Sequence, residues 1–160
     1  MQSLPPPNAP AAPLSDELAL VVAGARRRAL RDGDRQIDTA HLLHSLLETD
    51  PDVRAAFDDK GQVARLLGYL VQRSIGYGLR WQGAAEDSGA VPVVVGGATD
   101  WSPPAAAAME AGTGRASSRG EERARGVDVL AALAADTECR AVEVLGRAGV
   151  DVARLRQRLG

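Results

Sequence analysis

The residues best suited to chemistry in this sequence include two histidines, His41 and His44, which lie three residues apart. On a helix this spacing brings two imidazoles to one face, where they can share a metal ion. Their neighbours are mostly leucines, and no carboxylate or cysteine stands at a spacing that would complete a metal site. We therefore expect no metal centre.

Nucleophilic catalysis has equally little support. The only cysteine, Cys139, is predicted to lie on the apolar face of a helix, where a cysteine is a small buried hydrophobe, and no G-x-S-x-G segment is present. The acidic pairs Asp58-Asp59 and Glu121-Glu122 fall at predicted helix ends or loops, where carboxylates are usually solvated. We expect no catalytic residues and no cofactor, although an enzyme site without a recognisable pattern remains an alternative.

A run of arginines, Arg26-Arg27-Arg28 with Arg31, is the one basic cluster that could contact phosphates. The chain has 19 basic and 21 acidic residues, a net charge of -2, and no aromatic residue interleaves with the cluster. This pattern favours a solvated helix face over nucleic-acid binding. A DNA-binding transcriptional regulator that uses the face from Arg26 to Arg31 is the alternative function, and a salt-dependent gel shift would distinguish it.

Composition predicts an all-α protein. Hydrophobic residues make up 45% of the 160 residues but aromatic residues only 3%, so the core is built from alanine, leucine and valine, of which alanine and leucine favour helices. No run of 18 apolar residues predicts a membrane span, and the N-terminus lacks the basic and apolar regions of a secretory signal. With a single cysteine, the chain is expected to be cytoplasmic.

Apolar residues at three- and four-residue spacing predict four helices in the first half. The expected helices run from about 17 to 33 after the N-cap Ser15, over 39–49, from Pro51 through Phe57, and over 62–79. Residues 82–100 lose the periodicity and predict a linker. Residues 1–13 contain five prolines and predict a mobile tail.

The second half repeats the first. Ser15 and Ser102, Gly33 and Gly120, Leu43 and Leu130, and Leu46 and Leu133 are all separated by 87 residues. A constant offset over several helices indicates an internal repeat. We expect eight helices in two pseudo-symmetric four-helix units, residues 14–81 and 101–160, which pack as one globular domain.

Each unit resembles the Clp repeat N-terminal domain of the Hsp100 unfoldases ClpA, ClpB and ClpC. The strongest matches are Ile37-Asp38-Thr39-Ala40-His41-Leu42-Leu43 and Leu145-Gly146-Arg147-Ala148-Gly149-Val150-Asp151, and the resemblance extends from about Leu14 to Leu159. The ATPase modules of those unfoldases need G-x-x-x-x-G-K-[ST], yet this sequence contains no Gly-Lys pair. The initial methionine and the proline-rich tail favour a free-standing N-domain over a fragment of an unfoldase.

The resemblance has implications for individual residues. His41 matches the histidine of the family's Thr-Glu-His motif near a helix start, where a structural hydrogen bond is expected. In ClpC-type domains the glutamate of this motif binds phosphorylated arginine. Here Ala40 and Val127 stand at the two corresponding positions, and neither side chain can accept guanidinium hydrogen bonds. We therefore do not expect phosphoarginine binding.

The resemblance also implies a partner surface at the starts of the two first helices, which adaptors and cyclic peptide antibiotics use in the family. The matching residues here are Leu14, Ser15, Trp101, Ser102 and Pro103, and Trp101 is either a binding hot spot or part of the core. The expected function is non-enzymatic binding of a protein or peptide: a Clp adaptor, a substrate or a cyclic peptide. The chain would act as an adaptor or a decoy in Clp-dependent proteolysis.

Overall fold

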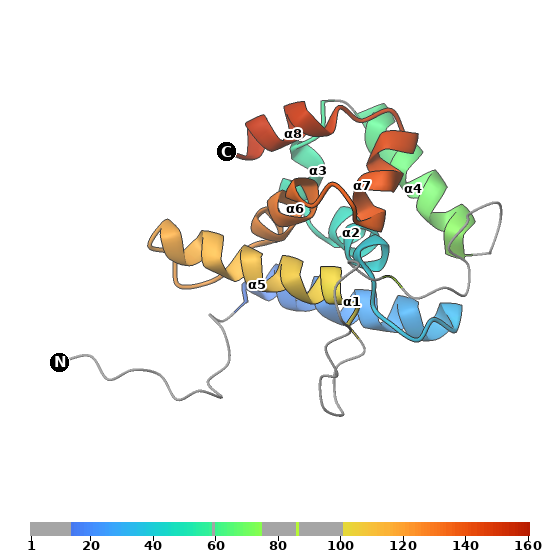
Figure 1. The fold of residues 1–160 in the computed structure, drawn as a ribbon, viewed down its shortest axis with the longest axis horizontal. Coiled ribbons are helices and arrows are strands. Elements are labelled where there is room, and N and C mark those ends of the chain that lie inside the picture. The colour runs from blue at the N-terminus through green and yellow to red at the C-terminus, as the bar shows by residue number, and fades with distance from the viewer. Residues whose placement is uncertain (1–13, 59, 75–85, 87–100) are drawn as a thin grey trace.

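The computed structural model describes residues 14–58, 60–74, 86 and 101–160, which form an all-α fold of eight helices (Figure 1). Extended pairing among these residues is limited to two isolated bridges, so the predicted fold class is confirmed. The helices are α1 (Asp16–Asp32), α2 (Thr39–Thr49), α3 (Pro51–Ala55), α4 (Lys60–Ser74), α5 (Pro103–Ser118), α6 (Gly126–Ala135), α7 (Arg140–Arg147) and α8 (Val152–Leu159).

The first helices of the two repeats, α1 and α5, begin and end in the same way. The hydroxyl of Ser15 accepts the Leu18 N–H at 3.1 Å, and the hydroxyl of Ser102 accepts the Ala105 N–H at 3.2 Å. After the helices the chain turns through Gly33 and Gly120, whose φ angles of 71° and 77° favour glycine. The offset of 87 residues thus matches N-cap to N-cap and turn to turn.

At its start, the first helix of each repeat contacts the segment that precedes the second helix of the other repeat. Leu14 forms a parallel bridge with Ala124, and Trp101 forms the equivalent bridge with Ile37. The Ser15 N–H donates to the Ala124 carbonyl at 2.8 Å, and the Ser102 N–H donates to the Ile37 carbonyl at 3.0 Å. Each first helix is therefore anchored beside the second helix of the other repeat.

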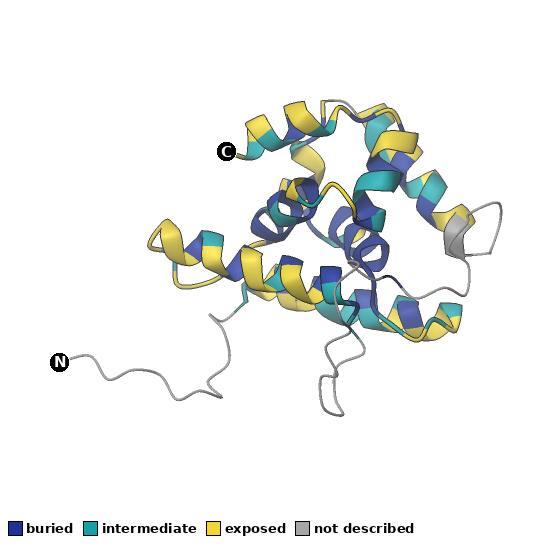
Figure 2. Cartoon of the chain, viewed as in Figure 1, coloured by how far each residue is buried: buried dark blue, intermediate teal, exposed yellow. Residues whose placement is uncertain are grey.

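The core lies around the second helices, α2 and α6, in the middle of the molecule (Figures 1 and 2). All nine residues from Thr39 to Leu47 of α2 are buried. The repeat-related leucines Leu43 and Leu130 are both fully buried. Helices α1 and α5 pack on α2 and α6 respectively, and α3, α4, α7 and α8 cover the other side.

Some predicted features differ from the structure or lie outside its described residues. Cys139 is buried as predicted but is the N-cap of α7, because its extended backbone (φ -81°, ψ 161°) precedes the first helical residue. Burial raises the pKa of its thiol to about 11, which suppresses the nucleophilic thiolate. The proline-rich tail 1–13, the end of the predicted fourth helix at 75–79, and the linker 82–100 except Glu86 lie outside the described residues.

None of the helices that the structure describes is both long enough and apolar enough to cross a membrane.

Candidate functional site

His41 forms a capping box at the start of α2. Its Nδ1 accepts the Asp38 N–H at 2.9 Å, while Asp38 Oδ1 accepts the His41 N–H at 2.8 Å. Because Nδ1 is an acceptor, Nε2 carries the ring proton and donates to Asp34 Oδ2 at 2.8 Å. The structural role expected for His41 is confirmed.

Two carboxylates that the sequence analysis did not place near His41 lie beside it. Potential ligand atoms of Asp32, Asp34 and His41 lie within 4.8 Å of one another, a separation that a metal ion can bridge. However, the Nε2 lone pair that a metal would need is occupied by the proton shared with Asp34. The arrangement fits a hydrogen-bonded contact between the end of the first helix and the start of the second, here called a tie, better than a metal centre.

The second repeat contains a corresponding tie, which is formed by an aspartate and an arginine. Asp128, 87 residues after His41, accepts the Arg125 N–H at 2.9 Å, and its Oδ1 lies 2.5 Å from Nη1 of Arg119. Arg119 in turn stands 87 residues after Asp32. In both repeats, the third residue of the second helix contacts a charged side chain at or just after the end of the first helix. This equivalence supports a structural role for both clusters.

Asp128 is the more deeply buried partner of the second tie, with 1% of its side chain exposed against 34% for Arg119. Burial acts to raise the pKa of Asp128, but the contact with Arg119 and the hydrogen bond from the Arg125 N–H outweigh it, so the pKa lies below its ordinary value. Asp128 is therefore ionised at neutral pH and needs Arg119 as its counter-charge.

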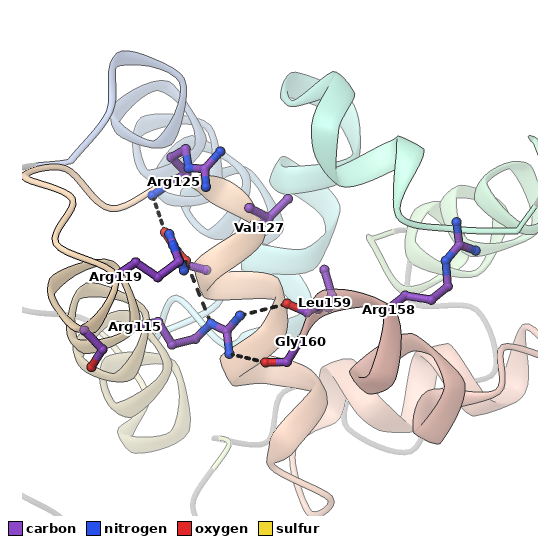
Figure 3. Close-up of a pocket in the computed structure, with 9 residues that line it drawn as sticks. Arg115, Arg119, Arg125, Val127, Arg158, Leu159 and Gly160 are labelled. Carbon is purple, nitrogen blue, oxygen red and sulfur yellow. Dashed lines mark hydrogen bonds and ion pairs between the residues drawn. The ribbon is translucent and has the colours of Figure 1, made fainter.

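Arg119 and Asp128 both line a pocket of about 640 Å³ between α5, α6 and α8 (Figure 3). The pocket is rich in arginine, and its lining residues are Arg115, Ser118, Arg119, Arg125, Val127, Asp128, Arg158, Leu159 and Gly160. Arg115 donates to the carbonyls of Leu159 and Gly160 at 3.0 and 3.4 Å, which holds the end of α8 against α5.

The four arginines of the pocket differ in their hydrogen-bond and ion-pair partners. Arg119 pairs with Asp128, Arg125 pairs with Glu121 at 3.1 Å, and Arg158 pairs with Asp58. Arg115 has main-chain carbonyls as its close partners and lies 3.8 Å from the Asp128 carboxylate that Arg119 already holds. The lining therefore brings together four guanidinium groups, which can donate charge-assisted hydrogen bonds to a ligand that carries negative charge.

The residues of the predicted partner surface differ in exposure. Leu14, Ser15, Trp101 and Pro103 are half-buried, whereas Ser102 is fully buried. The Ser102 hydroxyl accepts the Ala105 N–H and donates to the carboxylate of Glu86 at 2.8 Å. Leu14 pairs with Ala124, next to Arg125 of the pocket, while Trp101 pairs with Ile37. The part of the predicted surface around Leu14 thus lies beside Ala124, and the part around Trp101 lies beside Ile37.

The sequence analysis missed both the arginine pocket and Glu86. Arg115, Arg119 and Arg158 have the spacing of ordinary solvated helix positions, and nothing local indicates that α5 and α8 bring them together. The arginine face that the sequence did single out lies on α1, where Arg28 pairs with Glu48 and Arg27 and Arg31 are exposed.

The two positions that correspond to the phosphoarginine-binding glutamates have different surroundings. Ala40 is fully buried, whereas Val127 is half-buried in the lining of the arginine pocket. At neither position does the side chain provide the carboxylate that would accept hydrogen bonds from the guanidinium group of phosphoarginine.

We accordingly expect no saturable binding of free phosphoarginine in isothermal titration calorimetry at millimolar ligand. The matched positive control is a Val127→Glu variant, which restores a carboxylate at the second position. Stoichiometric binding of phosphoarginine to the wild-type chain at two sites would contradict the prediction.

Comparison with known proteins identifies the fold. No family model and no curated protein matches the sequence. Among solved structures, the Hsp104 N-terminal domain of Candida albicans superposes with a TM-score of 0.63 and 12% identity over 92% of this chain and 89% of that chain. The N-terminal domain of the caseinolytic protease associated chaperone ClpD of Arabidopsis thaliana superposes with a TM-score of 0.61 and 15% identity, covering 96% of each chain.

The chain thus has the Clp N-domain fold over nearly its whole length, as the sequence resemblance implied. At these levels of identity the likeness establishes the fold, and the function has to be argued from the surface of this chain.

Proposed function

We propose that this chain is a non-enzymatic, cytoplasmic protein- or peptide-binding module that acts as an adaptor or decoy in Clp-dependent proteolysis. The observation that carries the proposal is the pocket, which provides a concave surface lined by four arginines on a Clp N-domain fold. A decoy would compete for adaptors, substrates or cyclic peptide antibiotics that bind the N-domain of a full-length unfoldase.

The chemistry of the pocket suggests which part of a partner it binds. Arg125 and Arg158 have 48% and 39% of their side chains exposed, so their guanidinium groups can reach a ligand while the contact between Arg119 and Asp128 stays intact. An acidic side chain or a terminal carboxylate of a peptide would form charge-assisted hydrogen bonds with them. A second contact at Trp101, from the predicted partner surface, would be mainly apolar.

These two contacts are distinguished by matched variants in a comparative pull-down from native lysate. The baits are the wild-type chain, Arg125→Glu with Arg158→Glu, Trp101→Ala, and the control Arg123→Glu, each checked by circular dichroism. We expect a set of captured proteins that is retained by the Arg123→Glu control and lost from the pocket variant. If the folded pocket variant captures the same proteins in the same amounts as the wild type, the pocket is not the binding surface.

Salt provides an independent readout for the same complexes. Binding through the pocket should weaken when sodium chloride is raised, because added salt screens exposed charges. Binding through Trp101 should change little, since apolar contact does not depend on ion screening.

A further inference from the structure

The carboxylate of Glu86 is buried between the two repeats and receives hydrogen bonds from three other residues. Its Oε1 accepts the Thr39 N–H at 2.8 Å and the Ser102 hydroxyl at 2.8 Å. Its Oε2 accepts the Thr39 hydroxyl at 2.5 Å and the Arg140 N–H at 2.8 Å. Glu86 is only 4% exposed, so these four donors replace water around the charge.

The two hydroxyl groups connect this carboxylate to further helix N–H groups. The Ser102 hydroxyl accepts the Ala105 N–H at 3.2 Å, and the Thr39 hydroxyl accepts the Ala141 N–H at 3.0 Å. Each hydroxyl has one proton, which it donates to Glu86. The first turns of α2, α5 and α7 are therefore all hydrogen-bonded to this one carboxylate, directly or through a hydroxyl group. Helix N-termini favour negative charge because of their unsatisfied N–H groups and the helix dipole.

The equivalent position in the other half of the molecule shows why an added carboxylate is needed here. Asp50, the N-cap of α3, accepts the Asp52 N–H at 2.9 Å, and its Oδ2 lies so close to Gly126 that a Cβ there would clash with it. Asp50 thus places its own carboxylate at the start of α6. The matching N-cap of α7 is Cys139, which makes no side-chain cap hydrogen bond. Glu86 supplies the missing anion from a distant part of the sequence.

We propose that Thr39, Ser102 and the first turn of α7 form a carboxylate-binding site between the repeats, that Glu86 is its internal ligand, and that a free carboxylate binds there when the Glu86 side chain is removed. The site does not depend on the function proposed above. In the wild-type chain, any external carboxylate that enters this site must displace Glu86.

The geometry favours a carboxylate over a phosphate. Two oxygens with two donors each match the site, whereas a tetrahedral phosphate would bury further oxygens for which none of these contacts provides a donor. The nearby Asp38 carboxylate, 2% exposed and paired with Nη1 of Arg140 at 3.0 Å, adds negative charge that disfavours a dianion.

The test is rescue of a Glu86→Ala variant by acetate, measured as melting temperature by circular dichroism at pH 7. In sodium chloride the variant should melt about 5–10 °C below the wild type, because the helix starts lose their shared acceptor. Sodium acetate at equal ionic strength should restore about half of this loss. The wild type should show no comparable difference between the two salts, since Glu86 occupies the site.

Glu86→Gln is the matched control, because its amide fills the same space while presenting an NH₂ group to some of the donors. It should be destabilised but not rescued by acetate. If Glu86→Ala does not fold in chloride, recovery of its helical signal in acetate but not in chloride gives the same result.

Three outcomes would overturn the proposal. The first is a melting temperature of Glu86→Ala equal to that of the wild type. The second is an equal effect of acetate on Glu86→Ala, Glu86→Gln and the wild type. The third is a stronger rescue by sodium phosphate than by acetate, which would assign the site to tetrahedral oxyanions.

Discussion

Replacing either Leu43 or Leu130 with alanine is expected to lower the free energy of unfolding by about 2–5 kcal/mol. Both leucines are fully buried at positions that the internal repeat relates, one in α2 and one in α6. Each truncation removes buried methyl groups and leaves a cavity in the same core, so the two losses should be similar. Urea or thermal unfolding, followed by circular dichroism, measures them.

The matched control for this pair is Leu20→Ala on α1. The Leu20 side chain is 61% exposed, so its truncation should change stability by less than about 0.5 kcal/mol. If the free energy of unfolding of either core variant equalled that of the wild type, the alignment of the two repeats would be contradicted.

Replacing Arg119 with glutamine is expected to destabilise the fold by about 1–3 kcal/mol at neutral pH, because the buried Asp128 carboxylate loses its closest counter-charge. The lower part of this range applies, since 34% of the Arg119 side chain is exposed and solvent screens the pair. Asp128 also retains the hydrogen bond from the Arg125 N–H and the more distant guanidinium of Arg115.

The pH dependence of this loss has a definite sign. The pKa of Asp128 is lowered in the folded state, so its stabilising contribution is complete above the unfolded value of about 4 and is lost as the pH falls through the folded value. The stability difference between wild type and Arg119→Gln should therefore be full at pH 7 and shrink below about pH 4.

The matched control is Arg123→Gln, whose ion pair with Asp16 joins side chains that are 60% and 94% exposed and should contribute little. A difference between wild type and Arg119→Gln that stays constant from pH 7 to pH 3 would show that Asp128 is not the group concerned.

The features that the sequence predicted correctly are those encoded locally. Ser15 and Ser102 precede their helices as N-caps, Gly33 and Gly120 follow them, and the leucines of α2 recur at helical spacing. Each of these signals requires only neighbouring residues. Their repetition after 87 residues indicated two four-helix units, while the segments 37–43 and 145–151 carried the resemblance to the Clp N-domain.

The features that the sequence analysis missed depend on contacts between distant residues. The bridge between Trp101 and Ile37 joins the two repeats, and Glu86 reaches Thr39 and Arg140 across 47 and 54 positions. No periodicity or spacing indicates such contacts. The equivalence of the contacts at His41 and Asp128 was also missed. One contact joins a histidine to acids and the other joins an acid to arginine, so a search for identical residues does not align them.

The proposed role in Clp-dependent proteolysis is tested most directly by the rate at which a Clp unfoldase and protease, reconstituted from the same organism, degrade a reporter substrate. Excess wild-type chain should change this rate: an adaptor raises it, and a decoy lowers it. The variant with Arg125→Glu and Arg158→Glu should lose the effect, whereas the Arg123→Glu control should keep it. A degradation rate that is unchanged by the wild-type chain at every concentration, for substrates that need an adaptor and for substrates that do not, would contradict the proposed function.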